Sequence, residues 1–87
     1  TVESMLAQMK IESMSGANIY IRNTGKVDLN GWTVYVDNVP ATIAGGGNPG
    51  TVTPGSTGTI TLTAAPGSGK VVKVTTTQGA TAIQTVP

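Results

Sequence analysis

Polar side chains that could bind a ligand cluster between residues 23 and 31, where the sequence reads NTGKVDLNG. Asp28, Asn30 and Gly31 resemble the start of a calcium-binding loop. In such a loop the glycine is the sixth residue and a glutamate is the twelfth, but Gly31 comes two positions too early and the twelfth position is Val39. Because Asp and Asn side chains commonly bond to nearby backbone groups, we expect Asp28 and Asn30 to shape a turn and predict no metal site.

The segment at residues 66–70, PGSGK, resembles the end of a phosphate-binding loop. The complete motif has a glycine five residues before the Gly-Lys pair and Ser or Thr after the lysine, and this chain has Ala64 and Val71 at those positions. A phosphate-binding loop also leads into a helix, whose N-terminus holds the phosphate, whereas the residues after Lys70 alternate like a strand. We therefore interpret the segment as a hairpin turn and predict no cofactor.

Residues suited to catalysis are scarce. The sequence has no His and no Cys, which leaves Ser–Lys and carboxylate schemes as the available chemistry. Ser68 and Lys70 fall in one predicted exposed turn, where a lysine is too well hydrated to act as a base. Paired-carboxylate catalysis requires two acids that converge in a cleft. The four carboxylates are instead spread along the chain: Glu3, Glu12, Asp28 and Asp37. We predict a protein that is not an enzyme and has no catalytic residues.

The composition indicates one small all-β domain. The 87 residues include many Thr and Val, which favour strands, together with 12 Gly and 5 Pro, which favour turns. Charged residues make up 10% of the chain and the net charge is +1, whereas typical soluble domains have about 25% charged residues. The basic residues are dispersed and form no stripe, so we predict no binding to nucleic acid or to an anionic membrane surface.

Apolar and polar residues alternate in about seven short segments, with turn signals every 8–12 residues or so, which is typical of a small immunoglobulin-like antiparallel β-sandwich. We predict that sandwich over residues 10–87, with residues 45–50, GGGNPG, at the tip of a mobile loop. Alternation predicts these inward-facing residues: Met9, Ile11, Ser13, Ile19, Ile21, Leu29, Trp32, Val34, Val36, Ile60, Leu62, Val72 and Val74.

The first nine residues differ from the rest, because Val2, Met5, Leu6 and Met9 fall at helical spacing. A helix of that length is not stable alone. We therefore predict that residues 1–9 are the remnant of an upstream helix or linker. The alternative is that this segment continues into a first strand around Met9.

Outward-pointing aromatic residues and a strand edge are the candidate partner-binding features. Tyr20 and Tyr35 point away from the aliphatic face of their strands. If those strands pair, the two rings lie side by side, either as a patch for a sugar or a protein or as a cross-strand pair that stabilises the sheet. Residues 39–43 form a predicted edge, because Pro40 cannot donate a ladder hydrogen bond. The predicted partner-binding residues are Tyr20, Tyr35, Val39 and Ile43.

Three stretches together resemble the globular domain of archaeal type IV pilin-like surface proteins, namely the archaellins and the archaellum accessory subunits of the flagellar-protein F and G type. The stretches are IYIRNTGKVDLNGWTVYVDN, TPGSTGTITLT and GKVVKVTTTQG. They contain a strand ending in N-T-G at residues 23–25, a P-G turn at 54–55 before a Thr-rich strand, and G-K-x-x-K-V at 69–74. The resemblance covers roughly residues 9–85.

That resemblance implies a β-sandwich head that follows a hydrophobic N-terminal helix. It also implies a structural, non-enzymatic, extracytoplasmic domain of a cell-surface filament such as an archaellum or pilus. Its expected partners are proteins: copies of itself, filament subunits or surface-layer protein, with membrane attachment only through an upstream helix. The alternative function is an extracellular adhesion or carbohydrate-binding module that uses the surface aromatic residues.

Overall fold

The computed structural model describes residues 7–87. Residues 1–6, which carry most of the predicted helical stub, lie outside the described part of the chain. Met9 begins the first strand, as the alternative prediction for this segment has it.

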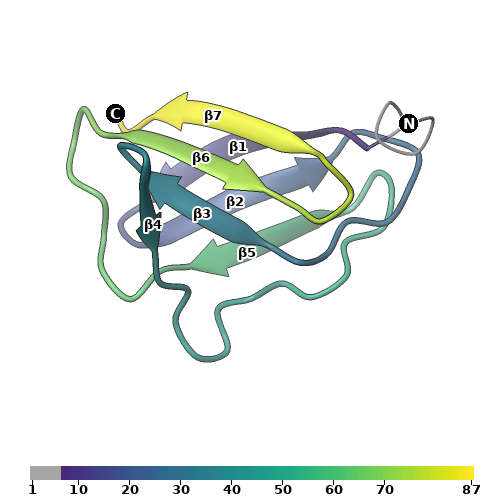
Figure 1. Cartoon of the computed structure of the whole chain (residues 1–87), viewed down its shortest axis with the longest axis horizontal. Helices are drawn as coiled ribbons and strands as arrows, with labels where there is room; N and C mark the ends of the chain where they lie inside the picture. Colours follow the sequence, from purple (N-terminus) through teal and green to yellow (C-terminus); the bar gives the residue numbers. More distant parts are fainter. Residues whose placement is uncertain (1–6) are drawn as a thin grey trace.

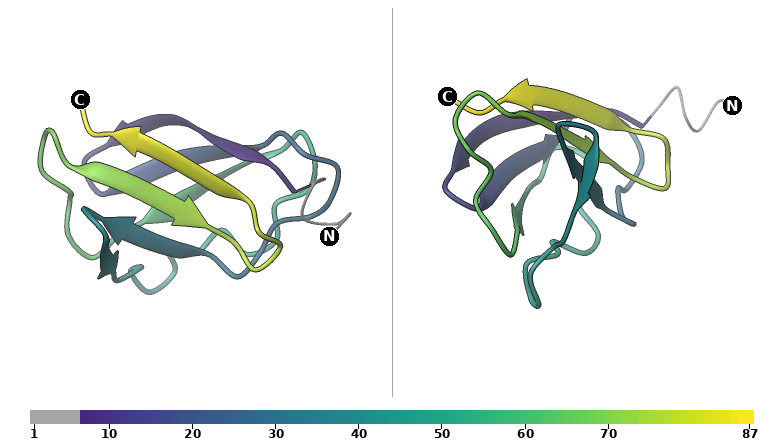
Figure 2. Two further views of the ribbon diagram at one scale, coloured as in Figure 1. Left: turned by 45° about the horizontal axis from the view of Figure 1, so that its top comes forward. Right: turned by 60° about the vertical axis from the view of Figure 1, so that its left-hand side comes forward.

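Residues 7–87 form seven strands arranged in two antiparallel sheets (Figure 1). The strands are β1 (Met9–Ser15), β2 (Asn18–Asn23), β3 (Thr33–Val36), β4 (Val39–Ala41), β5 (Thr57–Thr61), β6 (Val71–Thr75) and β7 (Thr81–Thr85). One sheet has the order β1-β2-β5 and the other has the order β4-β3-β6-β7. The sheets face each other as two layers, and β1 contacts β7 along one side of the sandwich (Figure 2). The prediction of a small all-β sandwich is confirmed.

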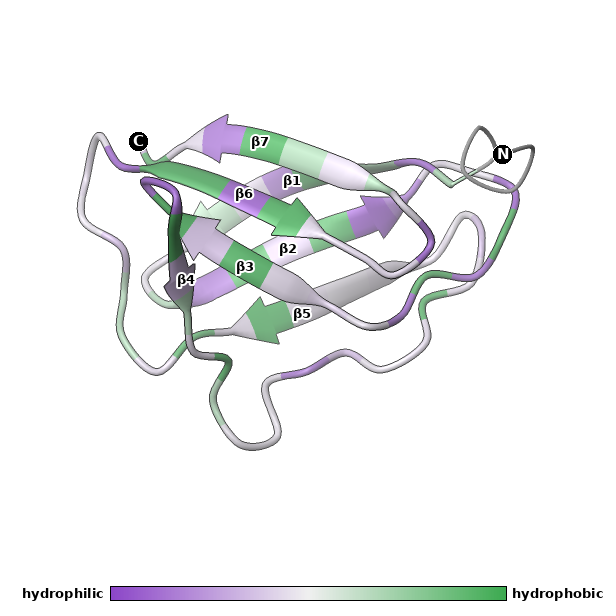
Figure 3. Cartoon of the chain, viewed as in Figure 1, coloured by the Kyte–Doolittle hydropathy of each residue, from purple (hydrophilic) through white to green (hydrophobic). Residues whose placement is uncertain are grey.

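The core fills the space between the two layers and is almost entirely aliphatic. In Figure 3 apolar and polar positions alternate along the strands, as expected when one face of each sheet is buried. Trp32 is also buried, and its indole Nε1–H donates a hydrogen bond of 2.6 Å to the carbonyl of Gly50. Seven aliphatic side chains of the described residues are completely buried: Ile19, Ile21, Leu29, Val34, Ile60, Val72 and Val74. All were predicted to face inward, and these predictions are confirmed.

A bulge in β1 changes which of its residues face the core. Ile11 pairs with Ile21, but Ser13 is the next residue to find a partner, so Glu12 is the extra residue of the bulge. The bulge reverses the alternation: Ser13 is exposed and Met14 packs against the core. The prediction that Ser13 points inward is therefore wrong, because strict alternation does not allow for an inserted residue.

Residues 44–53 run beside β5 and close the open side of the sandwich. Ala44 N–H donates to the carbonyl of Thr61 at 2.8 Å, and Thr61 N–H donates to the carbonyl of Gly47 at 2.9 Å. Farther along, Leu29 and Val52 exchange two backbone hydrogen bonds of 2.9 and 3.0 Å. These hydrogen bonds anchor the predicted mobile loop to β5 at Gly47. The segment also covers the edge of β5, which would otherwise be open to pairing with another strand.

Candidate interaction surface

The polar segment at residues 23–31 makes hydrogen bonds that stabilise the fold. Asn23 is completely buried and its Nδ2 donates hydrogen bonds of 2.8 Å to the carbonyls of Val27 and Val52. Its Oδ1 accepts a 2.9 Å hydrogen bond from Gly25 N–H. These contacts agree with the prediction that the segment NTGKVDLNG shapes a turn, and Asn23 organises that turn.

Asn30 does not bond to its own turn as predicted. Its Oδ1 accepts hydrogen bonds from Gln78 Nε2 at 2.8 Å and from Thr77 Oγ1 at 3.2 Å, so it joins the loop before β3 to the turn between β6 and β7. The segment at residues 66–70 is a turn, but not a hairpin turn, because it connects β5 of one sheet to β6 of the other.

The two tyrosines lie on different sheets. Tyr20 is on β2 of the three-stranded sheet, where it pairs with Thr59 and Ser13. Tyr35 is on β3 of the four-stranded sheet. Since both rings point away from the core, they occupy opposite outer faces of the sandwich. β2 and β3 do not pair, so the prediction of a side-by-side aromatic patch is wrong.

The outer face of the four-stranded sheet carries a row of apolar side chains with one lysine among them. Strand register places Pro40, Tyr35, Lys73 and Ile83 next to one another on four consecutive strands. Ile83 is 64% exposed and Val71, nearby on β6, is 42% exposed. We call the surface formed by Tyr35, Val71, Lys73 and Ile83 the apolar outer face.

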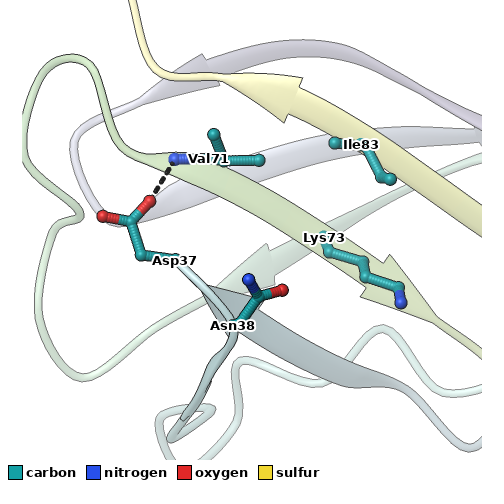
Figure 4. Close-up of a pocket in the computed structure, with 5 residues that line it drawn as sticks. All are labelled: Asp37, Asn38, Val71, Lys73 and Ile83. Atoms are coloured by element: carbon teal, nitrogen blue, oxygen red, sulfur yellow. Dashed lines mark hydrogen bonds between the residues drawn. The ribbon is translucent and has the colours of Figure 1, made fainter.

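A shallow hollow lies at one end of this face (Figure 4). It encloses about 270 Å³ and is lined by Asp37, Asn38, Val71, Lys73 and Ile83. Pockets for small ligands usually enclose roughly 300–1,000 Å³ and bury most of the ligand. This hollow is smaller and open, and it extends the apolar outer face.

Asp37 fixes the end of the β3–β4 hairpin to the start of β6. Its backbone N–H donates to the carbonyl of Val71 at 2.8 Å, and its Oδ1 accepts from Val71 N–H at 2.8 Å (Figure 4). The Val71 N–H is the main reason that the pKa of Asp37 lies below its ordinary value of 3.8, and Lys70 lowers this pKa further. Asp37 and Asn38 both have positive φ, 49° and 66°, as a two-residue hairpin turn requires.

Lys73 has no carboxylate beside it in the described chain. The ion pairs within residues 7–87 join Arg22 to Glu12 at 3.0 Å and Lys70 to Asp37 at 3.4 Å. The half-buried Lys73 therefore lies among apolar neighbours, and its ammonium group makes no ion pair with a carboxylate of residues 7–87.

The other two predicted partner-binding residues lie at the opposite edge of the sheet. Val39 begins β4, the edge strand, and is 64% exposed. Ile43 forms an isolated bridge with Leu62 and packs against the core, so much of its side chain is already covered. Val39 pairs with the inward-facing Val36, so it does not share the apolar outer face with Tyr35.

The described residues contain no group of three His, Cys, Asp or Glu side chains close enough to hold a metal ion. No helix among residues 7–87 has the length and apolar character needed to cross a membrane.

Solved structures with the same two-layer arrangement come from archaella. The archaellum periplasmic stator protein FlaG from Sulfolobus acidocaldarius superimposes with a TM-score of 0.61 at 22% sequence identity, over 91% of this chain and 98% of that chain. The chain has the fold of FlaG. The archaellum periplasmic stator protein complex of FlaF and FlaG from the same organism also matches, with a TM-score of 0.61 and 20% identity, over 92% of this chain and 89% of that one. No family model matches, and no curated protein matches.

The match to FlaG confirms the resemblance at the level of the fold. At 98% coverage the sandwich accounts for nearly the whole matched FlaG chain, so the likeness is not confined to one hairpin.

Sequence reasoning missed three residues of the apolar outer face, Val71, Lys73 and Ile83. The signal for Ile83 was present: Ala82 is buried, so alternation directs the side chain of Ile83 outward. The pairing of β7 with β6 across the short turn at residues 76–80 places Ile83 beside Lys73.

Proposed function

We propose that this chain is a non-enzymatic structural domain of an archaeal cell-surface filament apparatus, of the archaellum or a pilus, and that it acts through protein–protein contacts. The FlaG-like fold supports the class of protein. The apolar outer face supports the mode of action, since exposed aliphatic side chains grouped on a flat sheet are typical of binding surfaces. We further propose an extracytoplasmic location, with attachment to the membrane through an upstream helix.

The observation that carries this proposal is the exposure of Ile83 and Val71 around Lys73. Leaving a 64% exposed isoleucine in water forgoes part of the roughly 1.5–3 kcal/mol that burial of such a side chain provides. A partner surface recovers that free energy. Because Lys73 lacks a counter-charge in the described chain, we expect the partner to present a carboxylate within an apolar surface.

The proposed partners are protein subunits: further copies of this chain, other filament subunits or surface-layer protein. One matching solved structure is described as a complex of two stator proteins, FlaF and FlaG. That description supports subunit association as the role of this fold.

The test is a charge placed on the apolar outer face. We expect the wild-type chain to associate with rising concentration in sedimentation experiments and Ile83→Asp to weaken that association by about tenfold or more, as loss of a central contact does. Thr59→Asp is the matched control, because Thr59 is exposed on the outer face of the other sheet.

Equal association of Ile83→Asp and the wild type would contradict the proposed role of the apolar outer face. A wild type that is monomeric at all concentrations and does not form assemblies visible by electron microscopy would contradict self-association and leave a different subunit as the proposed partner. A strictly monomeric chain that binds sugars on a glycan array would favour the carbohydrate-binding alternative instead.

A further inference from the structure

The Asn30–Gly31 pair, which the proposed function does not use, has the chemistry of a spontaneous modification site. In an Asn-Gly sequence the glycine has no β-carbon, so its backbone nitrogen can approach the side-chain carbonyl of the asparagine. Asn30 is half-buried and Gly31 is exposed just before β3, so water reaches both residues. We propose that Asn30 is a deamidation site, and that contacts with the turn between β6 and β7 protect it from this reaction in the folded protein.

The reaction needs only water as co-reactant. The backbone nitrogen of Gly31 loses its proton and attacks Cγ of Asn30; the new C–N bond forms as the bond from Cγ to Nδ2 breaks, and the amide nitrogen leaves as ammonia. The resulting five-membered imide is then hydrolysed at either of its two carbonyls. One product has aspartate at position 30 and the other has isoaspartate, in which the main chain runs through the former side chain.

Two residues of the opposite turn hold Asn30 away from this reaction. Asn30 N–H donates to Gln78 Oε1 at 2.9 Å while Gln78 Nε2 donates to Asn30 Oδ1 at 2.8 Å, so the two residues are joined in a closed pair of hydrogen bonds. Thr77 Oγ1 adds a 3.2 Å hydrogen bond to the same Oδ1. Thr77 N–H also binds the Asn30 carbonyl at 3.1 Å. Rotation of the side chain toward Gly31 therefore requires this contact to open first.

Packing explains why the vulnerable glycine is at this position. Gly31 has φ +67°, and a Cβ added there would lie 2.3 Å from Cγ2 of Thr77. A larger residue is therefore disfavoured both by the backbone conformation and by the contact with Thr77. The amide of Asn30 is not required in the same way, because the recorded side-chain hydrogen bonds of Asn30 use its Oδ1, an atom type that a carboxylate also provides.

The two products differ in their effect on this contact. Aspartate keeps the acceptor that Gln78 and Thr77 bind. Isoaspartate adds one carbon to the main chain beside Gly31, where Thr77 leaves no space. The isoaspartate form therefore separates the loop before β3 from the turn at Thr77 and Gln78.

The test compares deamidation rates at mildly alkaline pH, measured by mass spectrometry of the peptide that contains residue 30. We expect slow modification in the folded wild type, and about tenfold faster modification in Gln78→Ala, which loses two hydrogen bonds of ordinary net strength. Thr77→Val, which keeps the shape of the side chain and removes its hydroxyl, should give a smaller acceleration. Gln8→Ala is the matched control, because Gln8 is an exposed glutamine outside this contact.

Deamidation rates in urea separate the protection given by Gln78 and Thr77 from the intrinsic reactivity of the Asn30–Gly31 pair. In urea the wild type and Gln78→Ala should react equally fast, because the contact exists only in the folded chain. Asn30→Asp should show no mass change at this position, because an aspartate has no ammonia to lose. The inference is overturned if Gln78→Ala reacts no faster than the wild type when folded, if the folded and urea rates of the wild type are equal, or if another asparagine is modified first.

Discussion

At the residue scale, Asn23 shows how one buried carboxamide can hold three segments together. Its side chain binds Val27 and Gly25 of the following turn and Val52 of the segment that closes the sandwich. Buried polar groups are tolerated when their hydrogen bonds are satisfied, and these contacts satisfy both ends of the amide. The Asn23 side chain therefore joins the turn to the closing segment.

We expect Asn23→Ala to lower the free energy of unfolding by ~3 kcal/mol, because the mutation leaves buried backbone groups without partners. Urea denaturation monitored by circular dichroism measures this loss. Asn18→Ala is a milder comparison, since Asn18 accepts one recorded side-chain hydrogen bond, from Thr61 at 2.8 Å, and should lose only ~1 kcal/mol. Equal losses in the two variants would contradict the role assigned to Asn23.

At the element scale, the edge strands of the two sheets are protected from pairing with other chains in different ways. β5 is covered by residues 44–53, β1 contacts β7, and β4 is a three-residue edge strand that contains a proline. Short edges and prolines discourage pairing with other chains. Any association of folded domains should therefore use a face of the sheet more readily than an edge.

The glycine run at residues 45–47 provides a matched test of how β5 is covered. A Cβ at Gly47 would lie 2.4 Å from the Thr61 carbonyl oxygen, whereas a Cβ at Gly45 meets nothing within 4 Å. We expect Gly47→Ala to cost ~1–3 kcal/mol by overpacking. Gly45→Ala should be neutral or should stabilise by up to ~1 kcal/mol, because it restricts the unfolded chain. Equal effects in thermal unfolding would show that the segment is not anchored at Gly47.

The strands could be predicted from the sequence because alternation is a local property. Ile19, Ile21 and Val34 face the core as their spacing indicates. The pairing of strands could not be predicted in the same way, since partners such as Tyr35 and Lys73 are far apart in sequence. For this reason the candidate site in the structure differs from the predicted one. The structure places Tyr20 and Tyr35 on different sheets, and it places Ile83 on the same face as Tyr35. The bulge at Glu12 likewise has no local signal.

At the scale of the whole molecule, the sparse titratable groups determine how stability responds to pH. The sequence has no His, and no other unperturbed side chain titrates between about pH 5 and pH 8. We expect the free energy of unfolding to stay constant over that range, measured by urea denaturation at several pH values. A slope there would indicate a group, such as a chain terminus, whose pKa differs between the folded and unfolded states.

Acid should weaken the fold partly through Asp37. Its pKa in the folded state is below 3.8, so the unfolded state takes up the proton more readily; the stabilisation is present above pH 3.8 and is lost as pH falls through the lower, folded pKa. Asn at position 37 tolerates positive φ but cannot titrate. The stability difference between the wild type and Asp37→Asn should therefore shrink below pH 3.8, and a difference that does not change with pH would contradict this role.

The apolar outer face lies on one of the two sheets, while the outer side of the other sheet carries the Arg22–Glu12 ion pair. Symmetry limits the assemblies that a subunit with one binding surface can form. If the same surface binds its own copy about a twofold axis, the surface is used up in the pair and growth stops at two. A filament of this domain alone would need a second, different contact surface, so the apolar outer face by itself specifies a closed dimer or a junction with another kind of subunit.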